Sequence, residues 1–209
     1  MIQRDYLDLA TVATALLGDP AVGHSWAAGS ALPEFRVSGL AGHLASQITV
    51  VAAVLDADPP GTPPISLLEH YARSTWTDGD IGSALNTGIR LAGEQTAAAG
   101  LPALREQAAA GLADLRRRLP GVPADTAVQL PFGPWALSLG DFLATRMLEI
   151  AVHCDDLAVS VGVPTPALPT RAEETVLGLL CRWAAARHGG TAVLRALSRS
   201  ERATGIAAL

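Results

Sequence analysis

The sequence predicts an all-α protein, built as a four-helix bundle with additional C-terminal helices. Four long segments repeat apolar residues with the period of an amphipathic helix, and no segment shows the sustained alternation of a half-buried strand. We also find no internal repeat. At 209 residues and 49% hydrophobic content, the chain suits one domain with a substantial core. We expect this single domain to span residues 1–209, with the core bundle over about 1–164 and a helical extension over about 165–209.

The first two long helices are separated by a loop rich in Gly, Ser and Pro. Apolar spacing predicts the first helix from about Arg4 to Leu17, where Gly18-Asp19-Pro20 ends it. The second helix is expected from Phe35 to about Leu55. Consecutive prolines from Pro59 onward prevent it from continuing further.

The middle of the chain predicts a short helix and then a long helical stretch. Ser66-x-x-Glu69 has the spacing of a capping box, in which the serine side chain accepts a hydrogen bond from the first turn. The long stretch runs from about Gly79 to Leu119 and is expected to break near Gly100-Leu101-Pro102. The connection that follows contains a short extended piece at Ala127–Leu130.

Helices are expected over most of the last third of the chain. A second capping-box pattern, Ser138-x-x-Asp141, opens the fourth long helix, which ends at Gly162-Val163-Pro164. Thr170-x-x-Glu173 opens another helix that continues to about Arg187. A short amphipathic helix near Ala192–Leu197 completes the chain.

The composition excludes several classes of function. A net charge of −5 argues against a nucleic-acid partner. The one basic run, Arg116-Arg117-Arg118, ends a helical pattern, where cations favour the negative end of the helix dipole. No segment approaches the roughly 20 consecutive apolar residues of a membrane span, and no leader-peptide pattern opens the chain. With only two cysteines, which are too few for a disulfide framework, we expect a soluble cytoplasmic protein.

Four polar or ionisable residues share the inward face of the fourth long helix. At about 100° per residue, with Glu149 taken as zero, His153 falls near +40°, Asp156 near −20° and Arg146 near +60°. Burying unpaired charges is costly. A carboxylate four residues before an imidazole lets both side chains bind one cation from adjacent turns. The pattern predicts half of a metal site, which needs a partner from another helix.

The second long helix offers that partner. His43 lies on its inward face, together with apolar residues and Gln47. A lone inward histidine is more often a satisfied core residue than a ligand, but here another helix presents a Glu and a His that lack a partner. Gln47, one turn after His43, either faces the same cavity or bonds a neighbouring carbonyl.

Two segments resemble signatures of the DinB-like, mycothiol-dependent maleylpyruvate isomerase family. The first is Phe35-Arg36-Val37-Ser38-Gly39-Leu40-Ala41-Gly42-His43-Leu44-Ala45. The second is Arg146-x-x-Glu149-x-x-x-His153-x-x-Asp156-Leu157, preceded by Leu130-Pro131-Phe132-Gly133. With the tail Ala184–Gly189, the resemblance covers most of the chain. The stretch after Pro164 predicts a helical extension rather than the separate C-terminal domain that the full isomerase carries.

The resemblance implies a DinB-like four-helix bundle that holds a divalent metal. Carried over residue by residue, the metal ligands are His43 from the second helix and Glu149 and His153 from the fourth. The metal is expected to be zinc, with nickel and manganese as alternatives. The family's thiol is mycothiol, the low-molecular-weight thiol of high-GC actinobacteria. All 15 basic residues here are arginine, a composition typical of high-GC coding sequences.

The leading functional hypothesis is a metal-dependent transferase or isomerase that activates a thiol. Three protein ligands leave a coordination position open, as in catalytic zinc sites, and coordination to zinc deprotonates a thiol at neutral pH. The expected partners are a small thiol, mycothiol, and a small electrophile, in a monomer or a homodimer. The alternative is a non-catalytic metal- or ligand-binding bundle that acts as a sensor or interaction module. A third interpretation is a buried Glu149–His153 pair without metal.

Two more residues of the fourth helix have expected roles. Asp156 is placed to accept an imidazole N–H and so fix the tautomer that presents the other nitrogen to the metal. The alternative is a solvated or capping carboxylate. Arg146 either orients a carboxylate or stabilises developing negative charge, or it forms a buried ion pair with Glu149.

The remaining histidines, cysteines and tryptophans are not assigned to the site. His24, His70 and His188 lie in or beside loops and are expected at the surface. Cys154 lies about 140° from Glu149 around the helix, so we expect a structural thiol that faces away. The four tryptophans either line the mouth of the pocket or pack in the core: Trp26, Trp76, Trp135 and Trp183.

Overall fold

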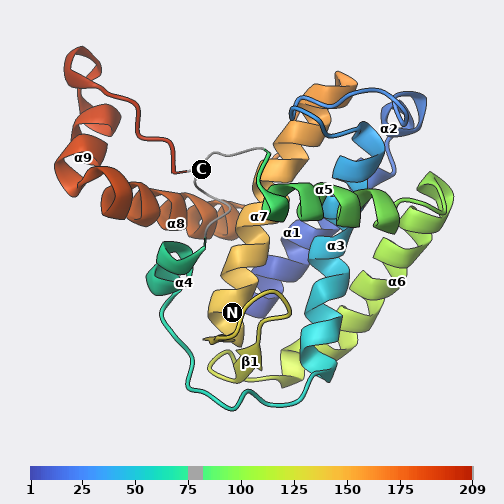
Figure 1. Cartoon of the computed structure of the whole chain (residues 1–209), viewed down its shortest axis with the longest axis horizontal. Helices are drawn as coiled ribbons and strands as arrows, with labels where there is room; N and C mark the ends of the chain where they lie inside the picture. Colours follow the sequence, from blue (N-terminus) through green and yellow to red (C-terminus); the bar gives the residue numbers. More distant parts are fainter. Residues whose placement is uncertain (75–81, 209) are drawn as a thin grey trace.

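The computed structural model of the chain describes residues 1–74 and 82–208 and is predominantly helical (Figure 1). Its core is a bundle of four helices whose apolar faces meet in one hydrophobic cluster. These helices are α1 (Ile2–Leu17), α3 (Val37–Asp56), α6 (Leu101–Arg118) and α7 (Leu139–Val161). The all-α bundle that the sequence predicts is therefore confirmed.

Local signals in the sequence set the ends of α7, the longest of these helices. The Ser138 side chain accepts a hydrogen bond from the Asp141 backbone N–H at 3.0 Å, as the capping-box pattern predicts. Gly162 ends the helix in the left-handed region, with φ 72°, which glycine adopts without steric cost. Between these two ends, α7 packs against both α1 and α3.

Helix α5 (Ala84–Thr96) crosses α3 so closely that the two backbones touch. A Cβ added to Gly42 would lie 2.1 Å from the Gly93 carbonyl oxygen, and one added to Gly93 would lie 2.4 Å from the Gly39 oxygen. The predicted break after α5 is confirmed, because Gly100 has φ 86°. The expected start of this stretch near Gly79 lies outside the described residues.

The short elements that were not predicted include a helix after α1 and a strand before α7. Helix α2 (Pro20–His24) follows α1 at once, because Asp19 accepts a hydrogen bond from the Ala21 N–H and Pro20 suits a first helical position. The predicted extended piece is confirmed as β1 (Ala127–Gln129), but it pairs with an unpredicted strand, β2 (Ala136–Ser138), in an antiparallel hairpin.

The hairpin also contacts the segment before α4 (Leu67–Arg73), where the Ile65 N–H donates to the Ala136 carbonyl at 3.0 Å. The predicted cap of α4 is present, with Ser66 accepting from the Glu69 N–H. The hydrogen bond between Ile65 and Ala136 holds the start of α4 beside the hairpin.

The predicted C-terminal extension consists of α8 (Thr170–His188), α9 (Gly190–Ser198) and a short 3₁₀ helix (Ser200–Arg202). Helix α8 packs against α1 and α7, and Arg171 pairs with the buried Asp5 of α1 at 3.2 Å. Figure 1 shows α8 leading away from the bundle to α9. As predicted, this helix begins at Thr170, with Pro169 in the cap position and no side-chain hydrogen bond at the cap.

Helix α3 is long and apolar enough to cross a membrane by length and composition alone. In the structure, 67% of that stretch is buried inside the protein. Its apolar character is therefore accounted for by its central place in the bundle, between α1, α5, α6 and α7.

Candidate metal centre

Three side chains that are distant in the sequence converge between α3 and α7. The Glu149 Oε2 atom lies 3.4 Å from His43 Nε2 and 3.2 Å from His153 Nε2. One possible ligand atom from each residue lies within 4.8 Å of the others. Each side chain is only 16% exposed. Within the described part of the chain, this is the group of His, Cys, Asp and Glu residues whose geometry suits a metal ion.

Asp156 lies behind His153, as the helical spacing predicts. Its Oδ2 atom is 2.9 Å from His153 Nδ1, on the side of the ring opposite to Glu149. A neutral His153 that donates Nδ1–H to this carboxylate presents its Nε2 lone pair to the cluster.

The three residues of the cluster differ in their preferred protonation states. Burial lowers the pKa of His43, so this imidazole is neutral at neutral pH. Burial opposes ionisation of Glu149 as well, but hydrogen bonds with His153 and His43 hold its pKa well below the usual value. Burial also opposes the charged form of His153, yet hydrogen bonds to Asp156 and Glu149 raise its pKa to about 9. Without a cation, the carboxylates thus retain a proton on His153.

Arg146 lies one turn before Glu149 on α7 and is buried, with 8% of its surface exposed. Its Nη1 donates to Gln47 Oε1 at 2.6 Å and its Nε donates to Thr145 Oγ1 at 3.1 Å. The guanidinium also lies 5.2 Å from the ring centroid of Phe132. Among the described residues no ion pair joins Arg146 to Glu149. The hydrogen bonds of Arg146 are instead with the uncharged side chains of Gln47 and Thr145.

Gln47 contacts both Arg146 and His43. Its Nε2 donates to the His43 backbone carbonyl at 2.9 Å and lies 3.3 Å from His43 Nε2. Both alternatives that the sequence left open therefore hold at once. The side chain bonds a neighbouring carbonyl and also borders the ligand cluster.

Aromatic side chains from α4, α8 and the hairpin pack against one another, and the charges of Arg146 and Glu149 act on two of them, His70 and Tyr71. The prediction that His70 is a surface residue is wrong, because it is only 4% exposed and its Nδ1 accepts from Trp135 Nε1 at 3.0 Å. Burial, followed by the charge of Arg146, lowers the pKa of His70 to about 4. The next residue, Tyr71, stacks on Trp183 with ring centroids 4.1 Å apart. Sequence reasoning missed His70 because its partner is distant along the chain.

The three tryptophans in the described part of the chain pack in or against the core. Trp183 is buried, and Trp26 and Trp135 are partly buried against the core. Trp76 lies outside the described residues.

The other predicted side chains are not part of the cluster of His43, Glu149 and His153. Cys154 is fully buried, and burial raises the pKa of its thiol to about 12, which suits a structural residue. His24 and His188 are exposed, as expected. The basic run at the end of α6 is engaged locally, since Arg117 and Arg118 both pair with Asp114.

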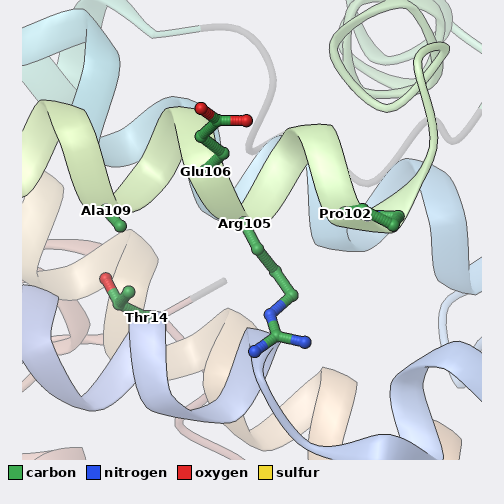
Figure 2. Close-up of a pocket in the computed structure, with 5 residues that line it drawn as sticks. All are labelled: Thr14, Pro102, Arg105, Glu106 and Ala109. Atoms are coloured by element: carbon green, nitrogen blue, oxygen red, sulfur yellow. The ribbon is translucent and has the colours of Figure 1, made fainter.

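A cavity of about 410 Å³ between α1 and α6 is a separate feature (Figure 2). It is lined by Thr14, Pro102, Arg105, Glu106 and Ala109. Figure 2 shows Arg105 extending toward α1 and Glu106 pointing away from it. None of the residues predicted for the metal site lines this cavity.

The structure is thus that of a helical bundle in which two helices bring together a His–Glu–His cluster that could hold a metal ion. Residues 7–158 match the mycothiol maleylpyruvate isomerase N-terminal domain family. The match covers well over half of the chain, which therefore belongs to this family. No curated protein and no solved structure matches significantly.

Proposed function

We propose that this protein is a metal-dependent enzyme that activates a low-molecular-weight thiol, mycothiol, for transfer to or isomerisation of a small electrophile. The observation that carries the proposal is the convergence of His43, Glu149 and His153 within 4.8 Å of one another. Membership of the mycothiol maleylpyruvate isomerase family supports the choice of thiol.

The donor set fits a divalent cation of the zinc type. Two imidazole nitrogens and one carboxylate oxygen are typical zinc ligands, and three protein ligands leave a position for a substrate. The contact between Asp156 and His153 Nδ1 favours the tautomer that such a site needs. Nickel and manganese accept the same donors and are the alternatives.

When bound, the cation would supply Lewis-acid chemistry that keeps a thiol deprotonated at neutral pH. The chain's own residues complete the site. Glu149 contributes a negative charge close to both imidazoles. Arg146 provides a buried positive charge that can stabilise negative charge on the reactants, and Phe132, 53% exposed, covers its guanidinium with an apolar surface.

Metal analysis tests the first part of the proposal. Protein purified without chelator, or reconstituted with zinc, nickel or manganese, should contain about one equivalent of metal. His43→Ala and His153→Ala should lose most of it, whereas His24→Ala, which changes an exposed histidine, should not. A metal content below about 0.2 equivalents in the reconstituted wild-type protein would refute the metal site.

A conjugation assay tests the second part. With mycothiol and an aryl halide, the thiolate sulfur forms a bond to carbon and the halide leaves, so consumption of thiol and release of halide should match. The His43→Ala and His153→Ala variants should lose this activity while circular dichroism shows that they stay folded. A metal-loaded wild-type protein that consumes no thiol with a range of electrophiles would contradict the enzymatic assignment.

A non-catalytic sensor or interaction module is the second candidate, and exposed leucines in the C-terminal helices favour it. Leu177 on α8 and Leu194 and Leu197 on α9 are each more than half exposed. Light scattering with and without metal separates the two functions, because a metal-dependent change of mass without thiol turnover would support the module. For the enzyme we propose a cytoplasmic location, small-molecule partners only, and a monomer or homodimer.

A further inference from the structure

His70 carries a ring N–H that the rest of the protein does not use. The side chain belongs to α4 and is only 4% exposed. Its Nδ1 atom accepts the Trp135 Nε1–H at 3.0 Å, so this nitrogen must present a lone pair. A neutral imidazole then carries its single proton on Nε2. No described residue accepts a hydrogen bond from this Nε2–H, which makes it a buried donor of fixed tautomer.

Arg146 also has donors to spare. Its Nε and Nη1 atoms donate to Thr145 and Gln47, and no described residue accepts a hydrogen bond from Nη2. The nearby carboxylate of Glu149 is already paired with the two histidines of the cluster. Neither Arg146 Nη2 nor His70 Nε2 is fully enclosed, so both border solvent-accessible space. A buried guanidinium that makes no ion pair with the described residues favours a negatively charged ligand.

The turn between β1 and β2 brings the two donors to the same region. The Phe132 ring centroid in this turn lies 5.2 Å from the Arg146 guanidinium, and Trp135, three residues later, donates to His70. The electrostatic effects agree with this placement. Burial and then the positive charge of Arg146 lower the pKa of His70 to about 4, and the negative charge of Glu149 raises it. The His70 N–H is therefore an uncharged donor at neutral pH, close to both α7 residues.

We propose that His70 and Arg146 form a carboxylate-binding site beside the metal cluster. His70 donates its Nε2–H to one oxygen of the ligand, and Arg146 donates from Nη2 to the same carboxylate. Trp135 is the positioning residue, because its N–H keeps the His70 proton on Nε2. Binding of a small carboxylate needs no thiol, but the role of the site rests on the proposed function, in which it assigns a carboxylate to the electrophile.

Histidine NMR of zinc-reconstituted protein tests the contact directly. With isotopically labelled histidine, the His70 ring should show the neutral Nε2–H tautomer, and the signal is assigned by its absence in His70→Gln. Sodium acetate should shift His70 Nε2 and its proton. Acetamide, which has the same shape and no charge, should bind at least about tenfold more weakly. An Nδ1–H tautomer, or a His70 signal that acetate does not move, would overturn the inference.

Variants at both ends of the Trp135–His70 hydrogen bond separate binding from packing. His70→Leu should weaken acetate binding about tenfold, the loss of one hydrogen bond to a charged group. His70→Gln should restore most of the affinity, because its amide can accept from Trp135 and donate to the ligand. Trp135→Phe breaks the same hydrogen bond but keeps the imidazole, so affinity should fall less than about threefold while both neutral tautomers appear.

Equal losses in His70→Leu and Trp135→Phe would overturn the inference, since the hydrogen bond between the two residues would then explain both. His24→Gln, at an exposed position, is the control and should bind acetate as the wild type does. The NMR titration of the wild-type protein remains decisive should His70→Leu fail to fold.

The charge of Arg146 and the position of the ligand need separate measurements. Arg146→Met should weaken acetate binding at least about tenfold, and Arg146→Lys, which keeps the charge, should lose less. The visible spectrum of cobalt-reconstituted protein reports on ligands of the ion. If acetate changes that spectrum with equal affinity in the wild type, His70→Leu and Arg146→Met, the carboxylate binds the ion and the inference is wrong.

Failure of this site and failure of the proposed function give different results. A protein that conjugates mycothiol but does not bind acetate through His70 refutes the carboxylate site alone. A protein that binds acetate through His70 but takes up no metal refutes the proposed function and leaves the carboxylate site intact.

Discussion

His70 should make the folded protein sensitive to mild acid. Its imidazole is 4% exposed and already accepts the Trp135 N–H, so burial and the nearby Arg146 lower its pKa to about 4. In the unfolded chain the same group takes up a proton near its ordinary value of 6.5. Between these two values the unfolded state binds more protons than the folded state.

The sign and size of the effect follow from this difference. The stabilisation from a neutral His70 is fully present above about pH 6.5 and is lost as the pH falls toward about 4. At about 1.4 kcal/mol per pKa unit, the largest loss is about 3 kcal/mol, and partial solvation of the ring reduces it to about 2 kcal/mol. The negative charge of Glu149 raises the pKa of His70, but this effect is smaller than the lowering by burial and by Arg146.

Urea unfolding of metal-free protein at several pH values between 7 and 4.5 measures this loss. His70→Gln keeps an acceptor for the Trp135 N–H but does not titrate, so its free energy of unfolding should fall less steeply with acid than that of the wild type. His24→Gln, at an exposed position, is the control and should follow the wild-type curve. Parallel curves for the wild type and His70→Gln would refute the assignment of His70 as a buried neutral histidine.

Two further predictions concern the cluster and the helix crossing beside it. Asp156→Asn removes the charge that orients His153 and should weaken zinc binding about 10- to 100-fold in a chelator competition, and unchanged affinity would show that the 2.9 Å contact does not tune the ligand. Gly42→Ala should lower the free energy of unfolding by about 3 kcal/mol or more, because its Cβ would lie 2.1 Å from the Gly93 oxygen. Gly111→Ala is the matched control, since its Cβ would meet its nearest neighbour at an ordinary 3.5 Å and alanine favours the helix. Equal stabilities of the two alanine variants would mean that α3 and α5 separate at little cost.

Periodicity predicted the helices of the bundle and the shared face of Glu149 and His153, because both follow from local helical geometry. For His43 it predicted only an inward position on another helix. That His43 joins Glu149 and His153 was implied by the family resemblance, since periodicity does not fix the height at which two helices meet. The capping residues Ser66 and Ser138 also predicted helix starts locally, since a cap bonds within its own first turn.

Features that depend on partners distant in sequence were not predictable in this way. In the sequence, His70 lies beside a loop, which is typical of a surface histidine. In the folded protein it is buried, because the hairpin brings Trp135 against it. The crossing of α5 over α3 is a similar case. The sequence contained a signal for a close helix crossing, because Gly39 and Gly42 are spaced to lie on one helical face with little side-chain volume. This signal could be interpreted only once the structure showed that Gly93 of α5 packs against that face.

The glycine contact between α3 and α5 also bears on the neighbouring histidine. Gly42 immediately precedes His43, and the carbonyl of Gly93 leaves no space for even a methyl group there. Helix α5 provides no ligand, yet it limits how far this turn of α3 can move away from α7. Sequence changes in α5 can therefore shift His43 relative to Glu149 and His153, and so change which ion would fit the candidate site, without replacing any candidate ligand.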